Sequence, residues 1–168
     1  MQYLSNLMEI PVLALGVGRQ IGTVEEVLIS LDTALLEGIV IKNTAWFSDK
    51  QHISFAEIHH IGADAITIKK EEAAEPFHPG EVDRLQVYDL RYLQGKSIVS
   101  ETGIQMGALS DILFDSVTGE IKAFEVSDGV ISDLLYGRAN LPLPPAQLVC
   151  DDRMIVPESM IELLRFRT

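Results

Sequence analysis

Four histidines and one cysteine are the side chains of this 168-residue chain best suited to bind a metal ion or act as a nucleophile. A metal site needs several His, Cys or carboxylate ligands that converge, and the sequence has no HxH or HExxH spacing. His59 and His60 are adjacent, so in a strand they would point to opposite faces. We therefore expect surface or partly buried side chains, and no metal site, at His52, His59, His60 and His78.

Cys150 follows the apolar stretch AQLV and precedes two aspartates. A catalytic thiolate needs a base and an electropositive setting, so a buried structural thiol is the prediction here. The serines lack a GxSxG elbow, and the GVG at 16–18 lacks the third glycine and the helix of a dinucleotide fingerprint. Acidic residues are too frequent for any pair to stand out. These observations predict that the protein is not an enzyme and has no cofactor.

Two segments carry the residue types that anchor protein interfaces. TAWFSDK holds the only tryptophan, and GVISDLLYGRANLP holds large aliphatic residues, a tyrosine and an arginine. Two interpretations stay open, because these side chains either form an exposed contact surface or fold back to close the ends of the fold or join its two halves. The candidate partner-binding residues are Trp46, Phe47, Leu134, Leu135, Tyr136 and Arg138.

The net charge of −12 is shared evenly, because residues 1–75 and residues 76–168 each carry −6. No basic run is present, which disfavours direct binding to nucleic acid or to an anionic lipid surface. The apolar runs are too short to cross a bilayer, and the N-terminal residues lack the pattern of a signal peptide. A single cysteine excludes an internal disulfide, so a reducing, cytoplasmic location is expected.

The sequence repeats itself at an offset of 85 residues. IGTVEEVLIS at 21–30 and MGALSDILFD at 106–115 place glycine, apolar and acidic residues in the same order. Both also have helical spacing, so the phrase alone does not exclude a helix. Turn residues and β-forming residues follow each phrase, as in DSVTGEIKAFEV, and this context favours a strand–turn–strand hairpin. The apolar run Val27–Ile29 then needs cover on both faces, or a bulge.

Further short strands follow in each half, with a single helical turn near Phe55–Ile58. The ending PESMIELLRFRT is typical of a short helix. The charged, proline-containing segment between the copies is typical of a linker. The sequence predicts a mainly β protein of two tandem small β-barrels with short helical turns and a short C-terminal helix. The expected division is a first domain at 1–75, a linker at 76–85 and a second domain at 86–168.

These residues resemble the pattern of the PRC-barrel family, whose small β-barrel occurs in the cytoplasmic part of the photosynthetic reaction-centre H subunit and in the C-terminal domain of the RimM-type ribosome maturation factor. The resemblance covers nearly the whole chain twice. It specifies a fold far better than a function. The matching positions are Gly18, Gly22, Val24, Ile39, Phe55, Ile58, Ile61, Gly62, Asp64, Ala65 and Ile66 in the first copy, and Leu93, Gly95, Gly103, Gly107, Asp111, Asp115, Gly119, Ile121 and Leu148 in the second.

The resemblance and the residues together predict a non-enzymatic adaptor that binds another protein. Two alternatives come from the family. One is an accessory protein of ribosome maturation that binds a ribosomal protein. The other is a regulator of electron transfer at a membrane complex, like the reaction-centre H subunit. A homo-oligomer is also compatible with the sequence.

Overall fold

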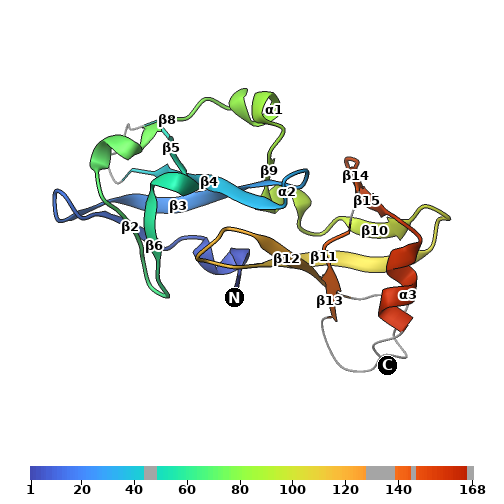
Figure 1. The fold of residues 1–168 in the computed structure, drawn as a ribbon. Helices are drawn as coiled ribbons and strands as arrows, with labels where there is room; N and C mark the ends of the chain where they lie inside the picture. Colours follow the sequence, from blue (N-terminus) through green and yellow to red (C-terminus); the bar gives the residue numbers. More distant parts are fainter. Residues whose placement is uncertain (44–48, 128–138, 145–146, 166–168) are drawn as a thin grey trace. The chain divides into compact units, whose positions relative to one another are not determined.

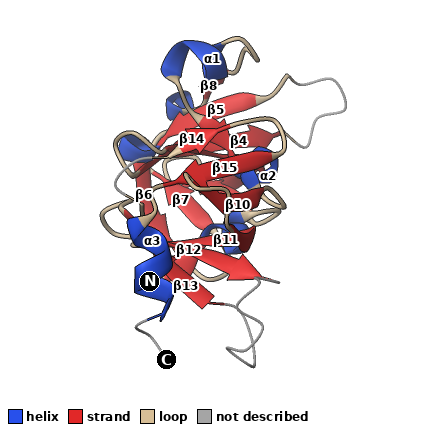
Figure 2. Cartoon of the chain, turned by 90° about the vertical axis from the view of Figure 1, so that its right-hand side faces the viewer, coloured by secondary structure: helices blue, strands red, loops and turns tan. Residues whose placement is uncertain are grey.

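A computed structural model of the chain describes residues 1–43, 49–127, 139–144 and 147–165 (Figure 1). The chain divides into two compact units. The first comprises Met1–Tyr92 with Phe114–Glu120, and the second comprises Leu93–Leu113 with Ile121–Thr168. Strands dominate both units and the helices are short (Figure 2). The predicted mainly β fold class is confirmed.

The first unit is built around a curled sheet with the strand order β6-β7-β2-β3-β4-β5-β8, in which β9 also pairs with β3. Neighbouring strands are antiparallel except β2 and β7, which are parallel. Its 3-10 turns are η1 (Leu4–Leu7), η2 (Phe55–Glu57) and η3 (Glu71–Ala73), and α1 spans Glu81–Leu85. The strands are β1 (Gln2–Tyr3), β2 (Pro11–Ala14), β3 (Arg19–Ser30), β4 (Leu35–Lys42), β5 (Gln51–Ser54), β6 (Ile58–Ile61), β7 (Ile66–Ile68), β8 (Glu75–Pro76) and β9 (Tyr88–Asp89).

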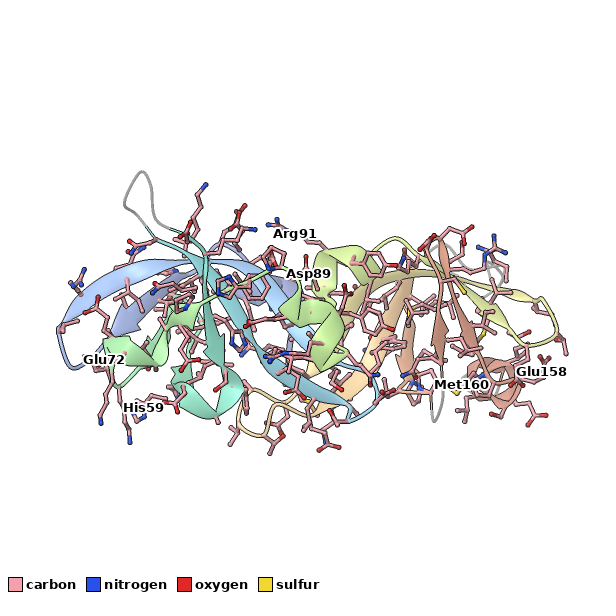
Figure 3. The ribbon with its side chains drawn as sticks, turned by 90° about the horizontal axis from the view of Figure 1, so that it is seen from above. His59, Glu72, Asp89, Arg91, Glu158 and Met160 are labelled. Atoms are coloured by element: carbon pink, nitrogen blue, oxygen red, sulfur yellow. The ribbon has the colours of Figure 1, made fainter. Side chains whose placement is uncertain are left out.

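The second unit repeats this topology. Its strand order is β13-β12-β11-β10-β15-β14, and β10 and β15 are parallel, as β2 and β7 are in the first unit. Helix α2 (Leu90–Leu93) precedes it, and α3 (Ser159–Arg165) is the predicted C-terminal helix, whose Met160 is buried (Figure 3). The strands are β10 (Ser97–Ser100), β11 (Gln105–Phe114), β12 (Ile121–Ser127), β13 (Ala139–Pro142), β14 (Leu148–Val149) and β15 (Arg153–Val156).

The repeated phrase forms a strand in both copies. IGTVEEVLIS lies in β3 and MGALSDILF lies in β11. The pairing register shifts beside Ile21 in the first copy and beside Met106 in the second, so each phrase begins at a β-bulge. A bulge places an extra residue in the strand and changes which side chains face inward. This explains why the apolar spacing imitates a helix although the backbone is extended.

Each sheet encloses its own apolar core. Val12, Ile39 and Ile66 have no exposed surface in the first unit, and Ile98 and Phe124 have none in the second. These residues come from the parallel strand pair and from the hairpin in each copy. The duplicated apolar positions therefore code for two separate cores.

The predicted turn DSVTG joins β11 to β12 and groups with the first unit. Asp115 Oδ1 accepts hydrogen bonds from the backbone N–H groups of Val117 (2.8 Å) and Thr118 (3.1 Å), an arrangement that fixes the turn. The turn then pairs with β4, because Leu36 donates its N–H to the carbonyl of Gly119 at 2.8 Å. A further bridge joins Leu35 and Glu120, which occupy the same position in the two copies of the repeat.

Gly119 is the residue that this contact requires. Its φ of +77° lies in the left-handed region, and a Cβ there would come within 2.9 Å of the Phe55 ring. Gly18 also has a positive φ, +66°, but no atom lies within 4 Å of its Cβ position. A comparison of Gly119 with Gly18 therefore separates the free-energy cost of the backbone conformation from the cost of a steric clash.

We predict that Gly119→Ala lowers the free energy of unfolding of the first unit more than Gly18→Ala does. The backbone cost of about 1 kcal/mol is common to both, and the clash with Phe55 adds roughly 1–3 kcal/mol at position 119. Urea unfolding, followed by the fluorescence of Trp46, the only tryptophan, measures the free energy of unfolding of both variants. Equal destabilisation of the two variants would contradict the close packing of Gly119 on Phe55.

Candidate functional site

The outer face of the hairpin β3–β4 is covered by residues that follow β8. Val27, Leu28 and Ile29 are all buried, although successive residues of a strand face opposite ways. Leu28 packs on the outer side in a cluster with Val40, Phe77 and Val87, against which Val82 also rests. The apolar run in β3 thus has cover on both faces, and the register of β3 against β4 also shifts between Leu28 and Ile29, so both options that the sequence left open are found.

A first hollow of about 620 Å³ opens beside this cluster. Phe77 anchors it, because its N–H donates to the carbonyl of Lys50 at 2.9 Å and the residue is only 9% exposed. Half of its lining residues are apolar or proline, and the others are charged residues and a histidine. The lining residues are Glu26, Asp49, Lys50, Pro76, Phe77, His78, Pro79 and Val82.

The charged side of the first hollow is an ion cluster. Lys50 Nζ lies 2.7 Å from Glu26 Oε1 and 3.4 Å from Glu25 Oε2. The register of β3 against β4 shifts between Val24 and Glu26, so a bulge at Glu25 lets two adjacent glutamates approach the same lysine. The hydrogen bond to Glu26 raises the pKa of Lys50, against a smaller opposing effect of burial. Lys50 is therefore charged and already engaged by two acids.

A second hollow of about 440 Å³ follows along β5 and β8. Its lining is more acidic than that of the first and includes Glu72 on η3 (Figure 3). Five carboxylates line the two hollows, against two lysines, one of which is the engaged Lys50. We call the two hollows together the β5–β8 groove. The second hollow is lined by His52, Ser54, Glu57, Lys70, Glu72, Ala73 and Glu75.

His52 connects the groove to the sheet beneath it. Its ring centroid lies 6.3 Å from that of Phe77, and its Nε2 would be 2.7 Å from a Cβ placed on Gly38. A Cβ there would also lie only 2.4 Å from the carbonyl oxygen of Ile53, so the neighbouring backbone requires a glycine at position 38. Burial lowers the pKa of His52, although the nearby carboxylates of Glu81, Glu75 and Glu37 oppose that change.

Beyond the groove, burial also raises the pKa of Asp89, which pairs with Leu28 at the other end of the covered face. Its Oδ1 accepts the backbone N–H of Arg91 at 3.4 Å, and the two residues are adjacent in Figure 3. A third hollow, of about 250 Å³, lies between η2, β6 and the DSVTG turn. Its lining contains no carboxylate, which distinguishes it from the groove.

The six candidate contact residues fall outside the described part of the chain, so their contact role stays a prediction. They are Trp46, Phe47, Leu134, Leu135, Tyr136 and Arg138.

The histidines lie where surface or partly buried side chains were expected, with His52 half-buried and the other three exposed. His59 and His60 are both exposed because β6 has a bulge between Ile58 and His60, so simple alternation does not apply. Among the described residues, no three His, Cys, Asp or Glu side chains form a group able to hold a metal ion.

The prediction of a buried Cys150 is wrong, because the thiol is free and exposed. Its backbone N–H donates to the carbonyl of Arg153 at 2.8 Å and closes the turn between β14 and β15. β14 has only two residues, at the edge of the sheet, and its Leu148 is 66% exposed. A short apolar run on such an edge strand does not enter the core.

Sequence analysis also missed the groove itself. Its anchor, Phe77, stands between charged residues and prolines in a segment that resembles a linker. One signal was available, since the run Val27–Ile29 demanded an apolar cover from elsewhere in the chain. Phe77, Val82 and Val87 are the apolar residues of the following segment that provide it.

Two small β units with one shared strand order define a tandem small-barrel protein. A family model described as PRC-barrel domain matches residues 1–74 and again residues 86–159. The chain belongs to the PRC-barrel family. The predicted resemblance and the predicted tandem barrels are both confirmed.

Other comparisons add little about function. A solved structure from Pseudomonas aeruginosa that carries the name 16S ribosomal RNA processing protein RimM matches 80% of this chain and 96% of its own, at 13% identity and a TM-score of 0.33. A match at this level bears on no functional conclusion. The comparison with curated proteins gives no match. Within the described residues, no helix is both long and apolar enough to span a membrane.

We predict that His52 makes the protein sensitive to mild acid. Its pKa is below 6.5 in the folded state, so the unfolded state takes up the proton first and stability falls as pH drops below about 6.5. His52→Gln should lose part of this pH dependence. Urea unfolding midpoints at about pH 7.5 and about pH 5.5 test it. The exposed His78→Gln is the control, and equal pH dependence in both variants would exclude this role for His52.

Proposed function

We propose that this protein is a non-enzymatic interaction module that binds another protein at the β5–β8 groove. The observation that supports the proposal is the combination of an apolar floor, at Phe77 and Val82, with a rim of carboxylates. A hollow with an apolar floor and charged groups around it is a common composition of a protein docking site. The overall charge of −12 favours a basic partner.

The candidate contact segments are proposed as further contacts of the same partner. Trp46 and Phe47 precede Asp49, which lines the first hollow, by only two or three positions in the sequence. We propose that they contact the same partner. Leu134, Leu135, Tyr136 and Arg138 form the second proposed contact, contributed by the other copy of the repeat. The cytoplasmic location expected from the sequence is part of the same proposal.

A ribosomal protein is the more specific partner that we consider. Ribosomal proteins are commonly basic, and an acidic groove suits such a protein better than it suits RNA, whose phosphates repel carboxylates. Family membership makes this version worth testing, because the family's barrel also occurs in a ribosome maturation factor. If the captured partner is not a ribosomal protein, the proposal of an interaction module stands and only the ribosomal partner is excluded.

We predict that reversing the charge of the groove abolishes partner capture. Glu72 and Glu75 are both exposed on its rim, so Glu72→Lys with Glu75→Lys should leave the fold intact and repel a basic partner. Affinity purification from the native cell with mass spectrometry compares this variant with wild type. The control is Asp64→Lys with Glu162→Lys, two exposed positions that do not line the groove and that change the net charge equally. If both variants lose the partner alike, net charge rather than the groove controls binding.

We predict that Trp46→Ala and Leu135→Ala each weaken capture of the same partner by at least roughly tenfold, a loss typical of an interface anchor. Circular dichroism and the urea midpoint decide whether the variants remain folded. Val117→Ser is the control, since Val117 is 84% exposed and lines the third hollow, not the groove. Unfolding of both loop variants would place Trp46 and Leu135 in the core and end their proposed contact role.

A further inference from the structure

We infer that the β5–β8 groove binds an extended basic segment, with an aliphatic side chain in the first hollow and a lysine or arginine side chain in the second. The inference rests on the proposed function and adds the chemistry of the partner. It depends on the two hollows having different linings and on their succession along the same strand.

The two hollows follow β5 in order. Lys50, directly before β5, lines the first, and His52 and Ser54 within β5 line the second. An extended chain rises about 3.3 Å per residue, so Lys50 and Ser54 are separated by about 13 Å along the strand. A partner in an extended conformation would present side chains on one face at intervals of about 6.6 Å. Two partner residues that are two or four positions apart could therefore enter the two hollows together.

The first hollow suits an uncharged, aliphatic side chain. Phe77, Val82 and two prolines make up half of its lining residues. Its lysine does not attract an acidic partner, because Glu25 and Glu26 already surround the ammonium group. Burial of an aliphatic side chain of the partner against Phe77 would supply the apolar part of the binding free energy.

The second hollow suits a cationic side chain. Glu57, Glu72 and Glu75 line it, and Lys70 is its only ordinary cation. Burial lowers the pKa of His52, so at neutral pH this ring adds no positive charge that would offset the carboxylates. A lysine or arginine of the partner would meet an excess of carboxylate oxygens, whereas a phosphate or an acidic side chain would be repelled.

The experiment uses the purified 168-residue chain and a capped peptide, Ser-Thr-Leu-Thr-Lys-Thr-Ser, in which leucine and lysine are two positions apart. Titration followed by ¹H–¹⁵N correlation spectra gives both the affinity and the position of binding. The expected result is a set of shifts centred on the amides of Lys50, His52, Ser54 and Glu75. Exchange of the lysine for norleucine, or of the leucine for serine, should weaken binding by about tenfold, typical of losing one anchor.

Matched variants assign the effect to the groove. Glu72→Gln with Glu75→Gln should weaken binding of the lysine peptide and leave the norleucine peptide unchanged. Asp64→Asn with Glu162→Gln removes the same amount of charge from exposed positions that do not line the groove and should change neither. Binding of the lysine peptide should also weaken as salt is added, because the carboxylates of the rim are solvent-exposed.

The outcomes separate this inference from the proposed function. If the native partner depends on the groove but the norleucine peptide binds as well as the lysine peptide, the second hollow does not select a cationic side chain. The proposal of an interaction module then still stands. If the lysine peptide shifts amides outside the groove, or shifts none, the inference is overturned. If partner capture also ignores Glu72→Lys with Glu75→Lys, the groove is not the docking site and the proposed function is overturned as well.

Discussion

The structure of the first unit depends on covering the outer face of its central hairpin. Leu28 and Val40 present apolar side chains on the side of the sheet that faces away from the core, and Phe77 and Val87 bury them. Burial of a phenylalanine side chain contributes about 2–3 kcal/mol, which is enough to fix a short segment. The position of Phe77 fixes β8 and the start of α1, and these elements together with β5 form the walls of the groove. The candidate site is thus a consequence of how the first unit buries the apolar residues on the outer face of its central hairpin.

The described residues of the second copy carry a polar group where the first copy places Val40. Position 125, which corresponds to Val40, is a glutamate that is 5% exposed and accepts a hydrogen bond from Ser110 Oγ at 2.9 Å. Ser110 itself corresponds to Glu25, the bulged residue beside Lys50. A buried carboxylate at this position requires polar partners and would not tolerate a phenylalanine ring packed against it. The two copies thus keep one topology, while the outer face of the hairpin has diverged between them.

The strands, the turns and the repeat could be predicted because their signals are local. Glycine at the bulge, turn residues in DSVTG and apolar residues at matching positions all act within a few residues of the chain. The groove could not be predicted in the same way, because Phe77 finds Leu28 and Val40 across more than thirty positions of sequence. A lone aromatic residue among charges and prolines has no periodicity to reveal its partner. Cys150 shows the opposite error, since a local apolar run suggested burial and a two-residue edge strand cannot provide it.

The division between core and surface also limits what the fold can do. The interior positions Val12, Ile39 and Ile66 are fully buried side chains, so they fill the space that a larger barrel would offer to a ligand. Recognition at this unit therefore has to use the outside of the sheet, where the groove lies.

In a groove with an apolar floor and a charged rim, apolar burial and electrostatic attraction both contribute to binding. The apolar floor contributes affinity over short distances, whereas the carboxylates and the net charge of −12 act at longer range and favour encounters with basic partners. Because each long-range contribution is screened by salt and the apolar one is not, the two parts of the groove respond to different solution conditions even though they lie on the same strand.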